Sequence, residues 1–312
     1  MACTFEIMLI DGRERNELVD IGNVALDEIE RLDGELSCFR PTSEVSFLNA
    51  EAARRDVVVG PELFEILSAA KQVWRETQGA FDVTAGSLIE LWRTAERTGT
   101  APEQSVIDEA LRWVGMQYVA LDEEMHAVRY VPDQSATLRP AQDADRSLHT
   151  ARCGIRINLG AIGKGYAVRK AASILREYDV SSALVSGGGS TIYGFGGGPD
   201  GDGWHVGIRH PSRLDERVAE IVLRDQAMSV SGGPAQRDRD VEETYEHIID
   251  PVTGMPAESQ AASVTVITED AMISDALATA FYLRGRAWAN RYCASHPETR
   301  AVFVDEDGNV LG

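Results

Sequence analysis

The chain has few cysteines, and no two of them form a C-x-x-C pair. Cys3, Cys38, Cys153 and Cys293 are scattered over 312 residues, which is typical of reduced thiols rather than of a disulfide framework or a zinc site. No run of 18 apolar residues is present, and Met1–Ile10 lacks the positive segment of a signal peptide. We therefore expect a cytoplasmic protein without a membrane span.

Positive charge is also scarce. Lys and Arg number 30 against 50 Asp and Glu, so the formal net charge is -20. This balance argues against nucleic acid or an anionic membrane surface as the main partner. An anionic ligand would need local donors, a helix end or a metal ion. Apolar residues at 44% and charged residues at 26% are typical of a globular protein, whose length suits one large domain or two ordinary ones.

The spacing of apolar residues predicts a mixture of helices and strands. We interpret residues 37–49 as a polar loop, residues 187–203 as a glycine-rich run and Asp133–Ala151 as a flexible insertion. Strands outnumber what a regular βαβ alternation would give, so the sequence favours an α+β fold. Helices are expected over 13–36, 61–78, 87–98, 103–115, 165–178 and 271–283. Strands are expected near the N-terminus and over 118–121, 127–131, 155–159, 182–186, 204–208, 218–223, 227–231 and 263–267, and a last hairpin is expected from 301–305 to Val310 through Asp307-Gly308.

The most informative segments are Tyr245–Pro256 and Ser274–Ala280. Asp275 and Thr279 are four residues apart in an Ala/Leu-rich helical pattern, so their oxygens lie on one helix face. A carboxylate on so apolar a face needs a partner. Together with the turn that follows His247, these oxygens indicate a hard-cation site, and hence a phosphate ligand.

Each of these residues also has a plain structural interpretation. Asp275 and Thr279 are residue types that hydrogen-bond each other or nearby backbone. A lone histidine such as His247 is more often a core residue, and Asp250 favours a turn in which it caps its own backbone. Only the order of the motifs along the chain favours the functional interpretation.

The segment Asn158–Gly165, with the sequence N-L-G-A-I-G-K-G, gives a second chemical signal. It lies between a predicted strand and a predicted helix, where free N–H groups and the helix dipole attract anions. Lys164 opposes that dipole, which is easier to understand if a ligand phosphate or a carboxylate lies opposite. The segment does not match a phosphate-binding Walker A loop, and a tight turn with a solvent-facing lysine is the alternative.

The order of these motifs resembles the FAD:protein FMN transferases, the ApbE-like family, over nearly the whole chain. The resemblance implies a single domain over 1–312 with two intertwined, similar α+β halves, T-fold-like, and a cleft for the flavin between them. It also implies a divalent ion, normally Mg2+, at the pyrophosphate of FAD. The blocks that carry it are L-S-C-F-R-P-T-S-E-V-S-F-L-N at 36–49, G-A-F-D-V-T at 79–84 with Leu91-Trp92, Asn158–Tyr166, H-I-I-D-P-V-T-G-M-P at 247–256 and S-D-A-L-A-T-A at 274–280.

The resemblance assigns roles to particular residues. The metal site corresponds to the backbone carbonyl of Ala161 and the side chains of Asp275 and Thr279, and Asp275 with His247 forms the catalytic pair. His247 corresponds to a residue that acts beside the phosphates, where we expect local proton transfer. Contacts to the nucleotide and its phosphates correspond to Asn49, Gly160, Gly163 and Lys164.

Three positions depart from the pattern of the family. Val230 replaces a threonine in a Thr-Ser-Gly run, and serines at Ser186 and Ser190 replace polar residues that flank paired glycines. The implied activity is Mg2+-dependent transfer of FMN from FAD to a Ser or Thr hydroxyl of an acceptor flavoprotein, which releases AMP. The alternatives are an FAD pyrophosphatase that gives FMN and AMP, or a non-catalytic flavin-binding maturation protein.

Overall fold

The computed structural model describes residues 3–131, 154–213, 215–232 and 248–311. The chain forms two compact units and passes between them more than once. Unit 1 comprises Met1–Glu35, Gly160–Val241 and Glu258–Gly312, and unit 2 comprises Leu36–Leu159 and Glu242–Ala257. The prediction of a mixed α+β protein is confirmed, because helices and antiparallel sheets occur in both units.

Unit 1 is built on a seven-stranded sheet in the order β1-β5-β6-β9-β10-β11-β12. Each strand in this order pairs with its neighbour in the antiparallel direction. Its elements in the described part are β1 (Phe5–Ile10), α1 (Arg15–Leu36), α6 (Gly163–Glu177), β5 (Ser182–Gly187), β6 (Thr191–Phe195), β7 (Trp204–Arg209), β8 (Arg217–Leu223), β9 (Gln226–Gly232), β10 (Ser263–Thr268), α7 (Ala271–Arg284), α8 (Arg286–Ser295), β11 (Arg300–Val304) and β12 (Val310–Leu311).

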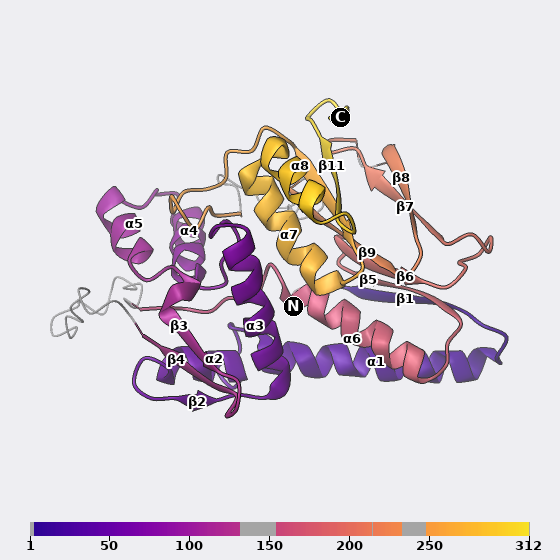
Figure 1. The fold of residues 1–312 in the computed structure, drawn as a ribbon, viewed down its shortest axis with the longest axis horizontal. Helices are drawn as coiled ribbons and strands as arrows, with labels where there is room; N and C mark the ends of the chain where they lie inside the picture. The colour runs from indigo at the N-terminus through magenta and orange to yellow at the C-terminus, as the bar shows by residue number, and fades with distance from the viewer. Residues whose placement is uncertain (1–2, 132–153, 214, 233–247, 312) are drawn as a thin grey trace. The chain divides into compact units, whose positions relative to one another are not determined.

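Two helices cover one face of this sheet (Figure 1). Helix α6 packs on β5 and β6, helix α7 packs on β9 and β10, and the two helices pack on each other. Along each strand, every second side chain points toward these helices, as the pleat of a β-sheet requires. Thr191 and Ser229 are directly paired across β6 and β9, and both hydrogen-bond side chains of α7. This inner face therefore presents hydroxyl groups to α7.

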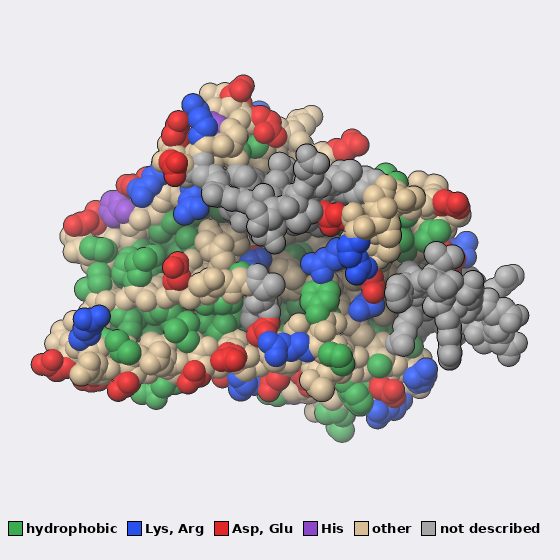
Figure 2. All heavy atoms as spheres, turned by 180° about the vertical axis from the view of Figure 1, so that it is seen from behind, with side chains coloured by type: hydrophobic (Ala, Val, Ile, Leu, Met, Phe, Trp, Pro, Cys, Tyr) green, Lys and Arg blue, Asp and Glu red, His purple; other side chains and the backbone are tan. Residues whose placement is uncertain are grey.

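The opposite face of the sheet is only partly covered. The hairpin β7–β8 packs Trp204, Ile208 and Leu223 onto it. Beyond the hairpin, Met8 and Ile10 of β1 are 55% and 38% exposed. Figure 2, which views the molecule from behind, shows hydrophobic side chains at the surface on that side.

Unit 2 combines a small sheet with several helices. The sheet has the order β2-β4-β3, and its strands are antiparallel. Leu88, Trp92, Ile107 and Ile249 belong to a buried cluster that joins α4 and α5 to the segment after residue 247. The elements in the described part are α2 (Glu44–Glu51), β2 (Val57–Val58), α3 (Pro61–Glu76), α4 (Gly86–Thr98), α5 (Gln104–Leu111), the 3-10 turn Met116–Tyr118, β3 (Val119–Asp122) and β4 (Ala127–Tyr130).

Two local predictions were wrong. Part of the expected loop 37–49 is helical, because the Ser43 hydroxyl accepts from the N–H of Ser46 at 3.0 Å and caps α2. Residues 155–159 form only an isolated bridge, since the N–H and C=O of Ile157 bond the side chain of Asn49 at 2.7 and 2.9 Å. The glycine-rich run 187–203 contains strand β6, which was not predicted.

Two further elements, α8 and β2, were not predicted. The expected insertion Asp133–Ala151 lies outside the described residues. Within the described part of the chain, no helix is both long enough and apolar enough to cross a membrane.

Candidate functional site

The close approach of α6 to α7 depends on Gly165 in the first turn of α6. A Cβ atom on this residue would lie 2.2 Å from the carbonyl oxygen of Ala271 and 2.7 Å from the Cα of Met272. Only glycine fits so near another backbone. The approach allows the N–H of Gly165 to donate to Oδ2 of Asp275 at 3.0 Å.

The Asp275 carboxylate is the centre of the candidate site. The residue is 5% exposed, and its Oδ1 accepts a hydrogen bond of 3.2 Å from the hydroxyl of Thr191. The Nζ of Lys164 lies 3.6 Å from the same oxygen. Hydrogen bonds and an opposite charge therefore offset the cost of burying this carboxylate.

Lys164 is placed as its unfavourable position in the sequence suggested. A cation at the start of α6 opposes the helix dipole, and we expected a carboxylate or a phosphate opposite it. The structure places the Asp275 carboxylate there, and the Lys164 side chain is only 18% exposed. Its Nζ also donates to the carbonyl oxygen of Gly160 at 3.5 Å. The alternative of a solvent-facing lysine is wrong.

Thr279 follows Asp275 by one turn on the same face of α7. Its hydroxyl lies 3.4 Å from the hydroxyl of Ser231 on β9. Asp275 and Thr279 thus each contact a hydroxyl of the sheet. The sequence did not point to Thr191 and Ser231 as part of this site. The sequence signal for Ser231 is the alternation of small hydroxyl residues at 229 and 231, which places both side chains on one face of a strand.

The donor set fits a hard cation. The oxygens of Asp275 and Thr279 are ligand types that Mg2+ prefers, and the structure supplies one buried carboxylate for them. Among the described residues, no group of three or more His, Cys, Asp or Glu side chains could hold a metal. One carboxylate with neutral oxygens is the arrangement of an ion shared with substrate phosphates rather than of an all-protein cage.

Two of the three departures from the family pattern point away from this carboxylate. Val230 packs against the cluster below the hairpin β7–β8, while its neighbours Ser229 and Ser231 face α7. Ser186 pairs with Ile192, which packs against the same cluster on that outer face. The departures at Val230 and Ser186 therefore remove no hydroxyl from the surroundings of Asp275.

Asn49 of unit 2 has a structural task. Its amide bonds both backbone groups of Ile157, and its Oδ1 also accepts from the hydroxyl of Tyr130 at 2.9 Å. Asn158 is the next residue, and its N–H donates to the carbonyl of Val83 at 2.7 Å. Asn49 thus fixes the segment that leads along the chain to Gly160.

Asp250 shapes a turn, as its plain interpretation proposed. Its Oδ1 accepts from the N–H of Val252 at 2.8 Å, and its carbonyl accepts from the N–H of Gly254 at 2.8 Å. Gly254 has a φ of 73°, and its carbonyl accepts from the indole N–H of Trp92 at 2.7 Å. The turn is therefore anchored in the core of unit 2. His247 lies outside the described residues.

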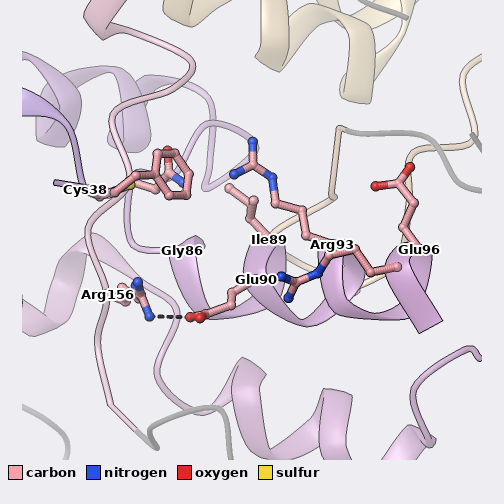
Figure 3. A pocket seen from close by; sticks show the side chains of 10 residues that line it. Cys38, Gly86, Ile89, Glu90, Arg93, Glu96 and Arg156 are labelled. Atoms are coloured by element: carbon pink, nitrogen blue, oxygen red, sulfur yellow. Dashed lines mark hydrogen bonds and ion pairs between the residues drawn. The ribbon is translucent and has the colours of Figure 1, made fainter. Parts of the chain in front are cut away.

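Unit 2 also contains a pocket of about 440 Å³ that the sequence did not reveal (Figure 3). Its floor is α4, and Figure 3 shows Glu90 of that helix pointing to Arg156, with which it forms an ion pair. The guanidinium of Arg93 lies over the ring of Phe39, 4.7 Å from its centroid. The lining residues are Cys38, Phe39, Gly86, Ile89, Glu90, Arg93, Glu96, Arg97, Arg156 and Asn158.

Comparisons with known proteins find relatives over nearly the whole chain. The FAD:protein FMN transferase of Treponema pallidum is 28% identical over 302 residues, which cover 92% of this chain and 79% of that protein. The crystal structure of the ApbE protein of Thermotoga maritima has a TM-score of 0.80 at 27% identity, over 98% of this chain and 92% of that one. The flavinyl transferase ApbE of Pseudomonas stutzeri shares the fold, with a TM-score of 0.78 at 24% identity, over 99% of this chain and 90% of that one. The profile of the ApbE family matches residues 1–303, and the chain belongs to that family.

Proposed function

We propose that this protein transfers FMN from FAD to a Ser or Thr hydroxyl of an acceptor flavoprotein and releases AMP. The observation that carries the proposal is the buried Asp275 carboxylate on α7, with Lys164 3.6 Å away and Thr279 one turn further on. Membership of the ApbE family, whose curated relatives are named FAD:protein FMN transferases, supports the choice of FAD as donor.

We assign the divalent ion, Mg2+, to Asp275, Thr279 and the backbone carbonyl of Ala161. When bound, Mg2+ stabilises negative charge on the pyrophosphate oxygens of FAD and assists the departure of AMP. Thr191 and Gly165 hold the carboxylate in place through the hydrogen bonds to its two oxygens. The free coordination positions of a single-carboxylate site are suited to phosphate oxygens.

The other assigned residues act on the nucleotide. We propose that Lys164 pairs with a phosphate, and that the backbone groups of Gly160 and Gly163 line the same loop at the start of α6, where N–H groups attract anions. Asn49 acts indirectly, because its amide is bonded to Ile157 and fixes the segment that leads to this loop.

The chemical step is a substitution at the FMN-side phosphorus. The acceptor hydroxyl oxygen forms a bond to that phosphorus, the P–O bond to the AMP phosphate breaks, and AMP leaves. We assign the hydroxyl proton to His247, because imidazole titrates near neutrality. We also propose that the two units act as the single catalytic domain expected over 1–312.

The test is to incubate the purified protein with FAD and Mg2+, with and without an acceptor flavoprotein, and to measure AMP and the intact mass of the acceptor. The proposal expects AMP chiefly with acceptor present, together with an acceptor mass raised by covalent FMN. AMP at the same rate without acceptor would make the protein an FAD pyrophosphatase. Binding of FAD with no AMP under either condition would make it a flavin-binding maturation protein.

A further inference from the structure

Arg169 of α6 connects the two helices that form the candidate site. Its Nη1 donates to Oδ2 of Asp270 at 2.9 Å, and the two side chains are 26% and 35% exposed. The same guanidinium lies 5.0 Å from the ring centroid of Tyr166, which is fully buried. Stacking on an aromatic ring holds a guanidinium in one orientation. The contact therefore joins a well-oriented side chain of α6 to the residue that precedes α7.

Asp270 is also the residue that begins α7. Its Oδ1 accepts from the N–H of Met272 at 2.7 Å and from that of Ile273 at 3.4 Å, which makes it the N-cap of the helix. A carboxylate is favourable at this end of a helix because the helix dipole is positive there. One oxygen of Asp270 serves the cap and the other receives Arg169. Asp270 thus ties the first turn of α7 to α6 while the cap stays complete.

The same two helices meet a second time at the Asp275 carboxylate (Figure 1). Gly165 lies one turn before Arg169 on α6, and its N–H donates to Oδ2 of Asp275 at 3.0 Å. Two contacts fix both the position and the rotation of one helix against another, whereas a single contact leaves it free to turn. A slip of one residue would shift α7 by about 1.5 Å and turn it by about 100°. A small part of such a movement would take the carboxylate away from its donor.

We propose that Arg169 is a positioning residue for the carboxylate that binds the metal. By holding the start of α7 against α6 through Asp270, it keeps Asp275 at the N–H of Gly165. The inference rests on the proposed function, which assigns Mg2+ to Asp275. A partly exposed ion pair contributes little to overall stability, so its place at this junction is better explained by geometry. Metal ligands depend in this way on the groups that orient them.

Arg169→Gln tests the proposal, because it removes the guanidinium and keeps a residue that favours a helix. The Asp275 carboxylate protects the amide of Gly165 from hydrogen exchange. Exchange of this amide, followed by NMR, should become about three- to tenfold faster as the contact loosens. AMP release in the presence of an acceptor should need about three- to tenfold more Mg2+ for half-maximal rate, less than the loss at a residue that contacts a ligand directly. The KM for FAD should change little.

Metal binding gives a readout that does not depend on turnover. Mn2+ replaces Mg2+ at oxygen sites, and the EPR signal of free Mn2+ falls when the ion binds. In the presence of FAD, Arg169→Gln should bind Mn2+ more weakly by the same factor as the shift in Mg2+ dependence. Arg169→Lys keeps the charge but not the planar fork, so it should recover part of the affinity.

Asp270→Asn separates the ion pair from the cap. Asparagine caps a helix about as well as aspartate, but it lacks the charge that pairs with Arg169. The variant should reproduce the effects of Arg169→Gln on Gly165 exchange and on Mg2+ dependence. The double variant should be no worse than either single one, because both remove the same contact.

Arg176 is a matched control on the same helix. It follows Arg169 by seven residues, and its guanidinium stacks 4.6 Å from the ring centroid of Phe195. It also forms an ion pair with Asp225, which lies between β8 and β9 and not on α7. Arg176→Gln removes the same charge and a similar pair. It should leave Gly165 exchange and Mg2+ dependence within about twofold of the wild type, because distant sites act independently.

Three results would overturn the proposal. Equal effects of Arg169→Gln and Arg176→Gln would indicate the charge or stability of α6 rather than the position of Asp275. An unchanged rate of Gly165 exchange in Arg169→Gln would show that the contact holds nothing in place. Faster exchange with unchanged Mg2+ dependence and Mn2+ binding would leave Arg169 a structural residue only. The proposed transferase activity is judged separately by AMP release from the wild type. If the wild type releases no AMP, Gly165 exchange still decides whether Arg169 positions Asp275.

Discussion

The Nζ of Lys164 lies 3.6 Å from Oδ1 of Asp275, and the two side chains are 18% and 7% exposed. The pair joins the loop at the start of α6 to the first half of α7 within unit 1. It explains why a lysine is tolerated where the helix dipole disfavours a cation. It also leaves one negative and one positive group together at the place to which we assign the metal and the phosphate.

The first prediction concerns the close packing of α6 on α7. Gly165→Ala places a methyl group 2.2 Å from the carbonyl oxygen of Ala271. The helices must then separate, which should lower the free energy of unfolding by about 1–3 kcal/mol. The separation should also lengthen the hydrogen bond from Gly165 to Asp275 and reduce FAD turnover. Urea unfolding measures the first effect and AMP release the second.

Gly34→Ala is the matched control in α1 of the same unit. A Cβ atom at Gly34 meets no atom within 4 Å. The substitution should raise stability by about 0.5–1 kcal/mol, because alanine loses less conformational freedom than glycine on helix formation. Equal losses of stability at both positions would contradict the packing argument.

The second prediction concerns the hydroxyl that holds the Asp275 carboxylate. Thr191→Val keeps the shape of the side chain and removes the donor of the 3.2 Å hydrogen bond. We expect half-maximal turnover to need several-fold more Mg2+, while the affinity for FAD changes little. Thr191→Ser keeps the hydroxyl and should restore the wild-type Mg2+ dependence. A Val variant with unchanged Mg2+ dependence would remove Thr191 from the site.

The third prediction concerns His247, whose role rests on the motif that precedes the turn at Asp250. General acid–base help is typically worth about 10²–10⁴ in rate, so His247→Ala should lower turnover by roughly two to four decades. The affinity for FAD should change much less. His205→Ala, on the exposed hairpin β7–β8, is the control and should keep full turnover. Loss of FAD binding in His247→Ala would make His247 a ligand contact or a core residue.

The fourth prediction concerns the pH dependence of stability through Asp82. Burial raises the pKa of this carboxyl to about 6, against hydrogen bonds from Thr84 that lower it. The folded protein therefore binds more protons than the unfolded chain between about pH 4 and pH 6. Stability from this group is present at low pH and is lost as pH rises through 6. The loss between pH 5 and pH 7.5 should be about 1–1.5 kcal/mol.

Asp82→Asn removes this titration, so the variant should gain stability relative to the wild type as pH rises from 5 to 7.5. Asp305 should behave in the opposite way, because hydrogen bonds from Asn309 and the backbone lower the pKa of its carboxyl. Asp305→Asn should lose stability relative to the wild type as pH rises through the acid range. Urea unfolding at pH 5 and pH 7.5 decides the sign for Asp82→Asn, and urea unfolding at about pH 3 and about pH 5 decides it for Asp305→Asn.

The fold class and the helix that carries Asp275 could be predicted from sequence because their signals are local. The spacing of apolar residues predicted α7 over 271–283, and the structure places it at Ala271–Arg284. The four-residue separation of Asp275 and Thr279 already placed both on one face. Helix α2 was missed because the polar sequence before it resembled a loop, and its start depends on a single cap from Ser43.

The partners of these residues could not be predicted, because they come from distant parts of the chain. Thr191 is 84 residues from Asp275, and Ser231 is 48 residues from Thr279. The pocket over α4 could not be predicted for the same reason, since its lining residues Phe39 and Arg156 lie far apart in the sequence. No local pattern contains information on which strand lies opposite a given helix face.

We propose above all that Asp275 holds the metal that FAD turnover needs. The most direct test is Mg2+-dependent release of AMP from FAD, in the presence of an acceptor, by the wild type and by Asp275→Asn. Asparagine keeps the shape and an oxygen acceptor but loses the charge that a hard cation requires. We predict that the variant folds, binds FAD and releases no AMP at any Mg2+ concentration. Normal Mg2+-dependent AMP release by the variant would contradict the assignment and would leave Asp275 as a structural partner of Lys164, Thr191 and Gly165.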